Sequence, residues 1–256
     1  MTRRIVIAGL FLGAIGAGTL GAQPAPQLSM TLRGRSQEIY SYGAASGKGA
    51  PKVLFLPGDG GWRGFAVDMA KAIAREGYDV YGWDIKKYLT DFTNKTTLSE
   101  AEMIADIHEV ARWITRDTGE RPLLAGWSQG AAMAVLAAAA PQSEKAYRGV
   151  VAIGLPNAAF LGWRTVDELT YITRKKPNEP VFSVAPRLPE VTPLPLALIY
   201  STSDEYITAT DAKRLYDTAR EPKRYFEVGA RNHRYDGARS EFFHALSESL
   251  RWVSLQ

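Results

Sequence analysis

Apolar residues along most of the chain fall into short continuous runs, which alternate with segments of helical spacing. Such runs predict strands of a sheet covered on both faces, where apolar side chains are needed on either side of each strand. KVLFLP is the clearest run of this kind, and further strands are predicted in YDVYGWDI, RPLLAGW, YRGVVAIGLP, LPLALIYS and KRYFEVG. Two earlier segments with mixed alternation, LSMTLRG and SQEIYSYGA, predict an antiparallel pair that precedes them.

The segments between the runs have the apolar spacing of amphipathic or buried helices. Helices are predicted in FAVDMAKAIAREG, LSEAEMIADIHEVARWITRDTG, QGAAMAVLAAAA, TATDAKRLYDTAR and SEFFHALSESLRWV. The first is expected to end at Gly77, and the second to begin with a capping box formed by Ser99 and Glu102. This alternation predicts an α/β fold with a mostly parallel central sheet and helices on both faces.

Residues 156–193 interrupt the alternation. They are rich in proline and aromatic residues and contain no clear sheet strand. A long excursion of this kind inside a compact domain is usually a lid or cap over a site. The alternative interpretation is a surface elaboration with no role in the chemistry.

The N-terminus has the three parts of a secretory signal peptide. Arg3 and Arg4 precede an apolar run at residues 5–20, and Ala22 supplies a small residue at a plausible cleavage point. About sixteen apolar residues are short for a full membrane span, although an uncleaved anchor is the alternative. We therefore expect a signal peptide at residues 1–22, a single domain at 23–256, and a periplasmic or secreted protein.

Composition limits the partners, disulfides and metal sites that the chain can have. The 256 residues include 31 basic and 27 acidic side chains and no long basic run, which argues against a nucleic-acid partner. The chain has no cysteine, which excludes disulfides, a lipid-modified N-terminal cysteine and thiolate metal sites. Only three histidines leave little room for a histidine-rich metal centre, so no metal and no organic cofactor are expected.

The stretch LLAGWSQGAAMA contains a G-x-S-x-G motif with Ser128 at its centre. The serine follows a predicted buried strand and opens a predicted helix, which is the context of a nucleophile on a strained strand-to-helix turn. Glycines at 126 and 130 allow the close approach that such a turn requires. The motif predicts Ser128 as a nucleophile that still needs a base to remove its proton.

The base and the orienting acid are predicted from loops that follow late strands. His233 lies just beyond the last strand, whereas His108 and His244 have the character of helix-face residues. Asp204 follows the preceding strand and is the expected acid; Glu205 is the fallback, and Asp204 could instead only cap the coming helix. The resulting chain order of serine, aspartate and histidine is that of α/β-hydrolases.

An acyl-transfer site also needs donors for a developing oxyanion. The backbone N–H of Gln129 is one expected donor, and that of Asp59 or Gly60 in the loop LPGDGGW is the other. The Asp59 carboxylate could cap its own turn or meet a cationic group of the substrate. The loop lacks the lysine of a P-loop and the Rossmann glycine spacing, so a nucleotide site is not expected.

With these residues in place, the chain from about Pro51 to Val253 resembles the α/β-hydrolase superfamily. Within it, LPGDGGW followed by GYDVYGWDIKKYL resembles the VirJ/AcvB family of bacterial virulence-associated periplasmic proteins. The resemblance implies a periplasmic location and, for part of that family, hydrolysis of aminoacylated phosphatidylglycerol. The cationic aminoacyl ester of such a lipid would give the Asp59 carboxylate a function.

These observations lead to one main hypothesis and one alternative. The main hypothesis is an exported serine hydrolase that cleaves carboxylic esters of small molecules or lipids, with contact to a membrane surface left open. The alternative is a non-catalytic, VirJ-like protein that keeps the fold and associates with secretion machinery. The sequence predicts neither the acyl group nor the oligomeric state.

Overall fold

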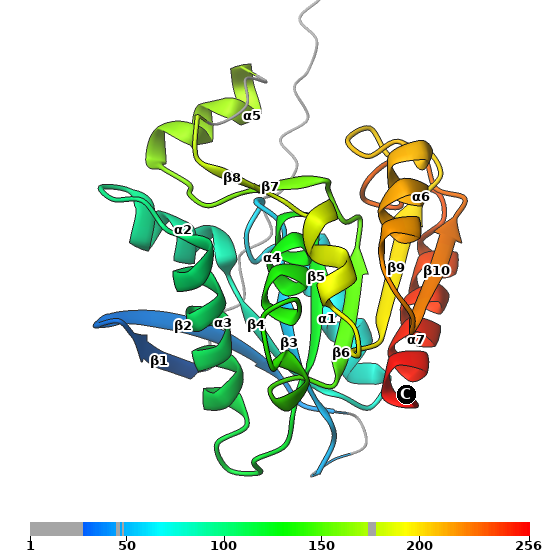
Figure 1. The fold of residues 1–256 in the computed structure, drawn as a ribbon, viewed down its shortest axis with the longest axis horizontal. Coiled ribbons are helices and arrows are strands. Elements are labelled where there is room, and N and C mark those ends of the chain that lie inside the picture. The colour runs from blue at the N-terminus through cyan, green and yellow to red at the C-terminus, as the bar shows by residue number, and fades with distance from the viewer. Residues whose placement is uncertain (1–27, 45–46, 48, 174–177) are drawn as a thin grey trace, which may run out of the picture.

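The computed structural model of the protein describes residues 28–44, 47, 49–173 and 178–256, and Figure 1 shows their arrangement. The predicted signal peptide at residues 1–22 lies outside the described residues. A central sheet runs through the molecule, and residues 158–173 and 178–183 lie beyond one end of its strands (Figure 1). Within the described ranges, no helix combines the length and the hydropathy needed to cross a bilayer.

Eight strands form the central sheet in the order β1-β2-β4-β3-β5-β6-β9-β10. Their bounds are β1 Leu28–Leu32, β2 Arg35–Tyr42, β3 Lys52–Leu56, β4 Asp79–Trp83, β5 Leu123–Trp127, β6 Gly149–Ile153, β9 Leu196–Ser201 and β10 Lys223–Val228. The first two strands pair antiparallel with each other, and β2 continues antiparallel onto β4. All other pairs are parallel, which confirms the predicted mostly parallel sheet.

The helices are α1 Phe65–Arg75, α2 Ile85–Thr93, α3 Glu100–Ile114, α4 Gln129–Ala138, α6 Ala209–Thr218 and α7 Arg239–Ser254, with a short 3-10 turn η1 at Ser143–Lys145. The capping box of Ser99 and Glu102 is present at the start of α3, and Gly77 adopts a positive φ just after α1. Helix α2 was not predicted. Its N-cap is Asp84, whose carboxylate accepts the backbone N–H groups of Lys86 and Lys87.

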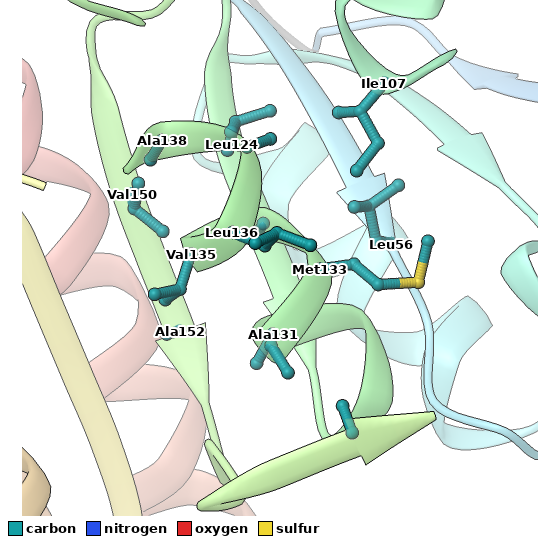
Figure 2. Packing of buried hydrophobic residues seen from close by; sticks show 14 of the residues in the cluster. Leu56, Ile107, Leu124, Ala131, Met133, Val135, Leu136, Ala138, Val150 and Ala152 are labelled. Carbon is teal, nitrogen blue, oxygen red and sulfur yellow. The ribbon is translucent and has the colours of Figure 1, made fainter. Parts of the chain in front are cut away.

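Alternate side chains of each inner strand enter two separate cores. Val53 and Phe55 pack with residues of α1 and α7, whereas Leu54 and Leu56 pack with residues of α3 and α4. This is the period of two expected for a strand covered on both faces. Figure 2 shows small residues of α4 set among the leucine and valine side chains of the strands, so the helix lies close to the sheet.

The segment 156–193 has structure that the sequence did not indicate. Strands β7 Ala158–Phe160 and β8 Val181–Ser183 form a separate antiparallel pair, which corrects the prediction of no strand here. The short helices η2 Thr165–Leu169, α5 Thr170–Thr173 and η3 Ala185–Glu190 complete the segment. Three residues per strand are too few to show a period of two, which explains why the sequence pattern missed them. We call residues 156–193 the insertion.

Candidate active site

Ser128 occupies a strained turn between β5 and α4. Its backbone has φ 55° and ψ −121°, a conformation that side-chain-bearing residues rarely adopt. Its N–H donates to the carbonyl of Ile153 at the end of the neighbouring strand, at 2.9 Å. The serine therefore stands at the carboxyl end of the parallel strands, where open α/β sheets bind ligands.

Two glycines make this turn sterically possible. A Cβ atom on Gly126 would lie 2.3 Å from the carbonyl oxygen of Gly130, and one on Gly130 would lie 2.1 Å from that of Leu56. Contacts this short against backbone atoms leave no room for a side chain. The G-x-S-x-G spacing is thus explained by helix α4 passing directly against the strand before it and the loop after β3.

Asp204 and His233 are in direct contact. The Oδ2 atom of Asp204 lies 2.6 Å from Nδ1 of His233, and the Asp204 side chain is fully buried. Its other oxygen accepts the backbone N–H groups of Tyr206 and Ile207, at 2.9 and 3.0 Å. Asp204 thus both caps its turn and contacts the imidazole of His233. The fixed Nδ1 contact leaves Nε2 as the nitrogen that can take a proton.

Glu205, the fallback acid, binds the same loop at a different atom. Its Oε2 accepts the backbone N–H of His233 at 2.7 Å. The neighbouring acids therefore have separate tasks: Asp204 orients the ring, and Glu205 fixes the main chain that carries it.

The imidazole of His233 lies over the end of the strand that carries the serine. Trp127, the residue before Ser128, stacks on the ring with centroids 5.5 Å apart. Tyr206 meets the ring edge-on at 5.3 Å. A Cβ atom on Gly154 would lie only 2.7 Å from Cε1 of His233, so glycine is required there as well.

The Nε2 atom of His233 is buried and has no hydrogen-bond partner among the described residues. A hydrogen bond from Ser128 to this nitrogen is therefore not formed in this state. Such contacts are often long in ligand-free enzymes and tighten when substrate binds. Nε2 of His233 therefore has no hydrogen-bond partner among the described residues, on a ring that stacks on Trp127, the residue before Ser128.

The remaining histidines lie elsewhere. His108 is on α3 and packs against the ring of Tyr147, with centroids 5.1 Å apart. Burial lowers the pKa of His108. His244 is on α7, largely exposed, and lies 3.8 Å from Glu248. Neither contacts the turn at Ser128, in agreement with the interpretation of both as helix-face residues.

The expected oxyanion donors come from two elements that meet at the serine. Gln129 is the first residue of α4, and N–H groups in the first turn of a helix have no intrahelical acceptor. The glycine loop approaches from the other side: a Cβ atom on Gly58 would lie 3.3 Å from Cβ of Ser128. A hydrogen bond from the Gly61 N–H to the Gly58 carbonyl, 3.0 Å long, closes a turn with Asp59 and Gly60 at its corners.

The Asp59 side chain is partly buried in the glycine loop. Burial raises the pKa of Asp59, while the nearby charges of His233 and Lys86 and a hydrogen bond from the Gly60 N–H favour its charged form. The side chain thus receives a donor from its own turn and also lies within electrostatic reach of the histidine. As the structure stands, the Gly60 N–H is directed at this carboxylate.

Two residues that organise the glycine loop were missed. Asp84 accepts the backbone N–H of Trp62 at 3.1 Å while it caps α2. The Trp62 indole is fully buried, stacks on Tyr40 at 4.9 Å, and lies where a Cβ atom on Gly82 would be 1.7 Å from it. Two motifs in the sequence could have indicated this arrangement. G-D-G-G-W supplies the Trp62 indole, and G-W-D supplies Gly82, against which the indole packs, and Asp84.

Comparison with known proteins identifies a bacterial protein family. A family model described as "Bacterial virulence protein (VirJ)" matches residues 52–214, which include Ser128 and Asp204 and stop before His233. A comparison with curated proteins found no match.

Solved structures share the fold at low sequence identity. The esterase domain of a Rhodothermus marinus protein is 17% identical with a TM-score of 0.59, over 87% of this chain and 94% of its own. Est1E from Butyrivibrio proteoclasticus with bound ferulic acid is 13% identical with a TM-score of 0.67, over 90% and 100%. A putative dienelactone hydrolase from Klebsiella pneumoniae is 17% identical with a TM-score of 0.64, over 88% and 95%. The chain has the α/β-hydrolase fold.

Proposed function

Because the chain belongs to the bacterial virulence protein (VirJ) family and has the α/β-hydrolase fold, we propose that it is a serine hydrolase of carboxylic esters. The observation that carries the proposal is the contact between Asp204 and His233 beside the strained turn of Ser128. The relatives of similar fold described as esterases support the same class of reaction.

In the proposed mechanism, Nε2 of His233 removes the proton from the Ser128 hydroxyl as its oxygen attacks the ester carbonyl. Asp204 keeps the proton of the imidazole on Nδ1 and stabilises the imidazolium that forms. The N–H of Gln129 and one N–H of the glycine loop bind the oxyanion. His233 then protonates the leaving alcohol, and a water molecule activated by the same nitrogen releases the acid from the acyl-enzyme. No metal or organic cofactor takes part in these steps.

A fluorophosphonate probe tests the nucleophile, because it reacts covalently with activated serines. Wild-type protein should be labelled, while Ser128→Ala and His233→Asn should not. A second serine at a surface position, Ser240→Ala, serves as the matched control and should label like the wild type. An unlabelled wild type would overturn the hydrolase proposal and favour the non-catalytic interaction protein.

For the substrate, we propose an ester lipid with a cationic headgroup, in particular aminoacylated phosphatidylglycerol. The resemblance of LPGDGGW and GYDVYGWDIKKYL to the VirJ/AcvB family, part of which is implied to hydrolyse such lipids, supports this substrate. The Asp59 carboxylate, which lies within electrostatic reach of His233, supports it as well. Lysyl-phosphatidylglycerol in detergent micelles should be cleaved to lysine and phosphatidylglycerol. Asp59→Asn should reduce that activity more than cleavage of a neutral p-nitrophenyl ester. Cleavage of simple esters with lysyl-phosphatidylglycerol left intact would rule this substrate out.

A lipid substrate requires approach to a membrane, and we propose that the insertion makes this contact. It carries large apolar side chains that are exposed, namely Val166, Leu169, Ile172 and Val181. Its Glu168 forms an ion pair with Lys86, and its Glu179 forms one with Arg164. The negative charge of each carboxylate is thus offset by a cation, which limits its repulsion of anionic headgroups. Sedimentation with phosphatidylglycerol vesicles should retain the wild type and lose a Val166→Ser/Leu169→Ser/Ile172→Ser variant. Equal binding of both proteins would contradict the contact.

The proposed location is the periplasm or the extracellular space. It rests on the sequence of residues 1–22 alone. N-terminal sequencing of the protein from a fractionated host should find a mature chain that begins at Gln23, in the periplasmic fraction. A cytoplasmic protein with an intact N-terminus would contradict export.

A further inference from the structure

The side chain of Gln129 binds the main chain of the insertion. Its Nε2 donates to the carbonyl of Phe160 at 2.7 Å, and its Oε1 accepts the N–H of the same residue at 3.0 Å. Phe160 is the last residue of β7, whose other edge pairs with β8 through Val181. The amide of Gln129 thus completes β7 as a neighbouring strand would. Gln129 is itself 6% exposed, so both contacts are partly shielded from water.

A second buried side chain holds the same segment three residues further on. Thr93, the last residue of α2, accepts the N–H of Trp163 at 2.9 Å and donates to the carbonyl of Leu89 at 2.7 Å. Both Thr93 and Trp163 are buried. The segment from Phe160 to Trp163 is therefore fixed at both ends, at one end by the turn of the nucleophile and at the other by α2.

Gln129 differs from Thr93 in its place in the chain. It follows Ser128 directly, and its backbone N–H is the expected oxyanion donor. One residue thus links the position of the reacting carbonyl, through its main chain, to the position of the β7 segment, through its side chain. A shift of β7 by one residue would break both Phe160 hydrogen bonds, so the Gln129 side chain holds the end of β7 at a fixed distance from the nucleophile turn.

We propose that Gln129 is a positioning residue for substrate size: its side chain sets the distance between Ser128 and the wall formed by residues 158–163, and thereby selects the acyl or leaving group. This inference rests on the proposed serine hydrolase function. The side chain itself does not contact the reacting atoms. A pocket wall of fixed position discriminates between acyl chains by about 10- to 200-fold per methylene group gained or lost in contact.

The test compares kcat/KM for p-nitrophenyl octanoate and p-nitrophenyl acetate in the full-length protein. Gln129→Met removes both hydrogen bonds at nearly constant volume, and the octanoate-to-acetate ratio should change by about tenfold or more, whatever happens to the absolute rates. Gln129→Glu keeps the acceptor for the Phe160 N–H but loses the donor, so its ratio should lie between those of the wild type and Gln129→Met.

Gln37→Met is the matched control. Gln37 is also a buried glutamine hydrogen-bonded at both ends, to Asp91 and to the Trp83 indole, but it lies on β2. Its substitution should lower the melting temperature and leave the ratio at its wild-type value. A Gln129→Met ratio equal to that of the control would overturn the positioning role. If the wild type neither reacts with a fluorophosphonate nor cleaves either ester, the hydrolase function fails first, and the role of Gln129 fails with it.

Discussion

Glu205 accepts the backbone N–H of His233 at 2.7 Å, so the histidine is held at its main chain by one acid and at its ring by the acid next to it. The two contacts have different consequences for catalysis. Loss of the ring contact changes which nitrogen carries the proton, whereas loss of the main-chain contact only loosens the loop. The pair of variants at these positions can therefore identify which acid acts with His233 in the proposed mechanism.

Asp204→Asn should lower kcat by about a thousandfold or more, because an amide in this position favours the wrong tautomer of the imidazole. The asparagine oxygen can still accept from Tyr206 and Ile207, so the fold should survive. Ester hydrolysis by the purified variant measures the first effect, and circular dichroism on heating measures the second. A variant that retains more than about a tenth of the wild-type kcat would remove Asp204 from the triad.

Glu205→Ala should lower kcat by about tenfold or less, since it removes one hydrogen bond to the main chain of His233 and leaves the ring contact in place. Glu205→Gln, which retains an acceptor oxygen, should restore most of the activity. The same ester assay applies to both variants. The reverse order, with Glu205→Ala more damaging than Asp204→Asn, would exchange the roles of the two acids.

Ser128→Gly should be more stable than Ser128→Ala by about 1 kcal/mol, because glycine adopts a φ of 55° without strain and alanine does not. Both variants lack the nucleophile and should be inactive, so any difference between them reports on the backbone. Urea denaturation of the pair gives the free energies of unfolding. Equal stabilities would mean that the turn relaxes once the hydroxyl is gone.

Gly82→Ala should lower the free energy of unfolding by about 1–3 kcal/mol or more, since the new methyl group has to displace the buried ring of Trp62. Gly43→Ala is the matched control, because a Cβ atom there has no neighbour within 4 Å. Tryptophan fluorescence during denaturation follows the displaced indole as well as the stability. If the free energies of unfolding of Gly82→Ala and Gly43→Ala are equal, the Trp62 indole is not packed against Gly82.

Asp59→Asn should change the dependence of stability on pH. Burial raises the pKa of Asp59, so the folded protein binds this proton more tightly than the unfolded chain does. The free energy of unfolding contributed by Asp59 is therefore fully present below the unfolded-state pKa, near pH 4, and is lost as pH rises through the folded-state pKa. The asparagine variant should gain stability relative to the wild type over that interval. A constant difference between the two proteins across acid and neutral pH would contradict the raised pKa.

The sequence was informative wherever a residue's neighbours in the chain determine its surroundings. Ser128 is flanked by the glycines that its turn requires, and Asp204 and His233 follow strands whose parallel pairing brings their ends together. The strands of the central sheet, most of the helices and the contact between acid and base could therefore be predicted. The capping box at Ser99 is local in the same way.

The missed features depend on contacts between distant segments. No residue next to Gln129 in the sequence indicates that its side-chain amide binds Phe160. Similarly, Asp84 accepts the backbone N–H of Trp62, a residue 22 positions earlier in the chain. Helix α2 was missed because the predicted strand YDVYGWDI runs directly into it, with no glycine or proline between the two elements. Its N-cap, Asp84, also accepts a hydrogen bond from the glycine loop. The contact of Glu205 with the main chain of His233 leaves no pattern in the sequence, because it joins residues 28 positions apart.

The strain at Ser128 also bears on how such a protein would change over generations. In a chain that served only to bind other proteins, a mutation from serine to glycine at this turn would cost no function and would add stability. Selection for folding alone would then favour glycine, and the hydroxyl would be among the first features of the site to disappear. A serine held at a φ of 55° is thus a marker by which catalytic members of a lineage can be told from members that have kept only the scaffold.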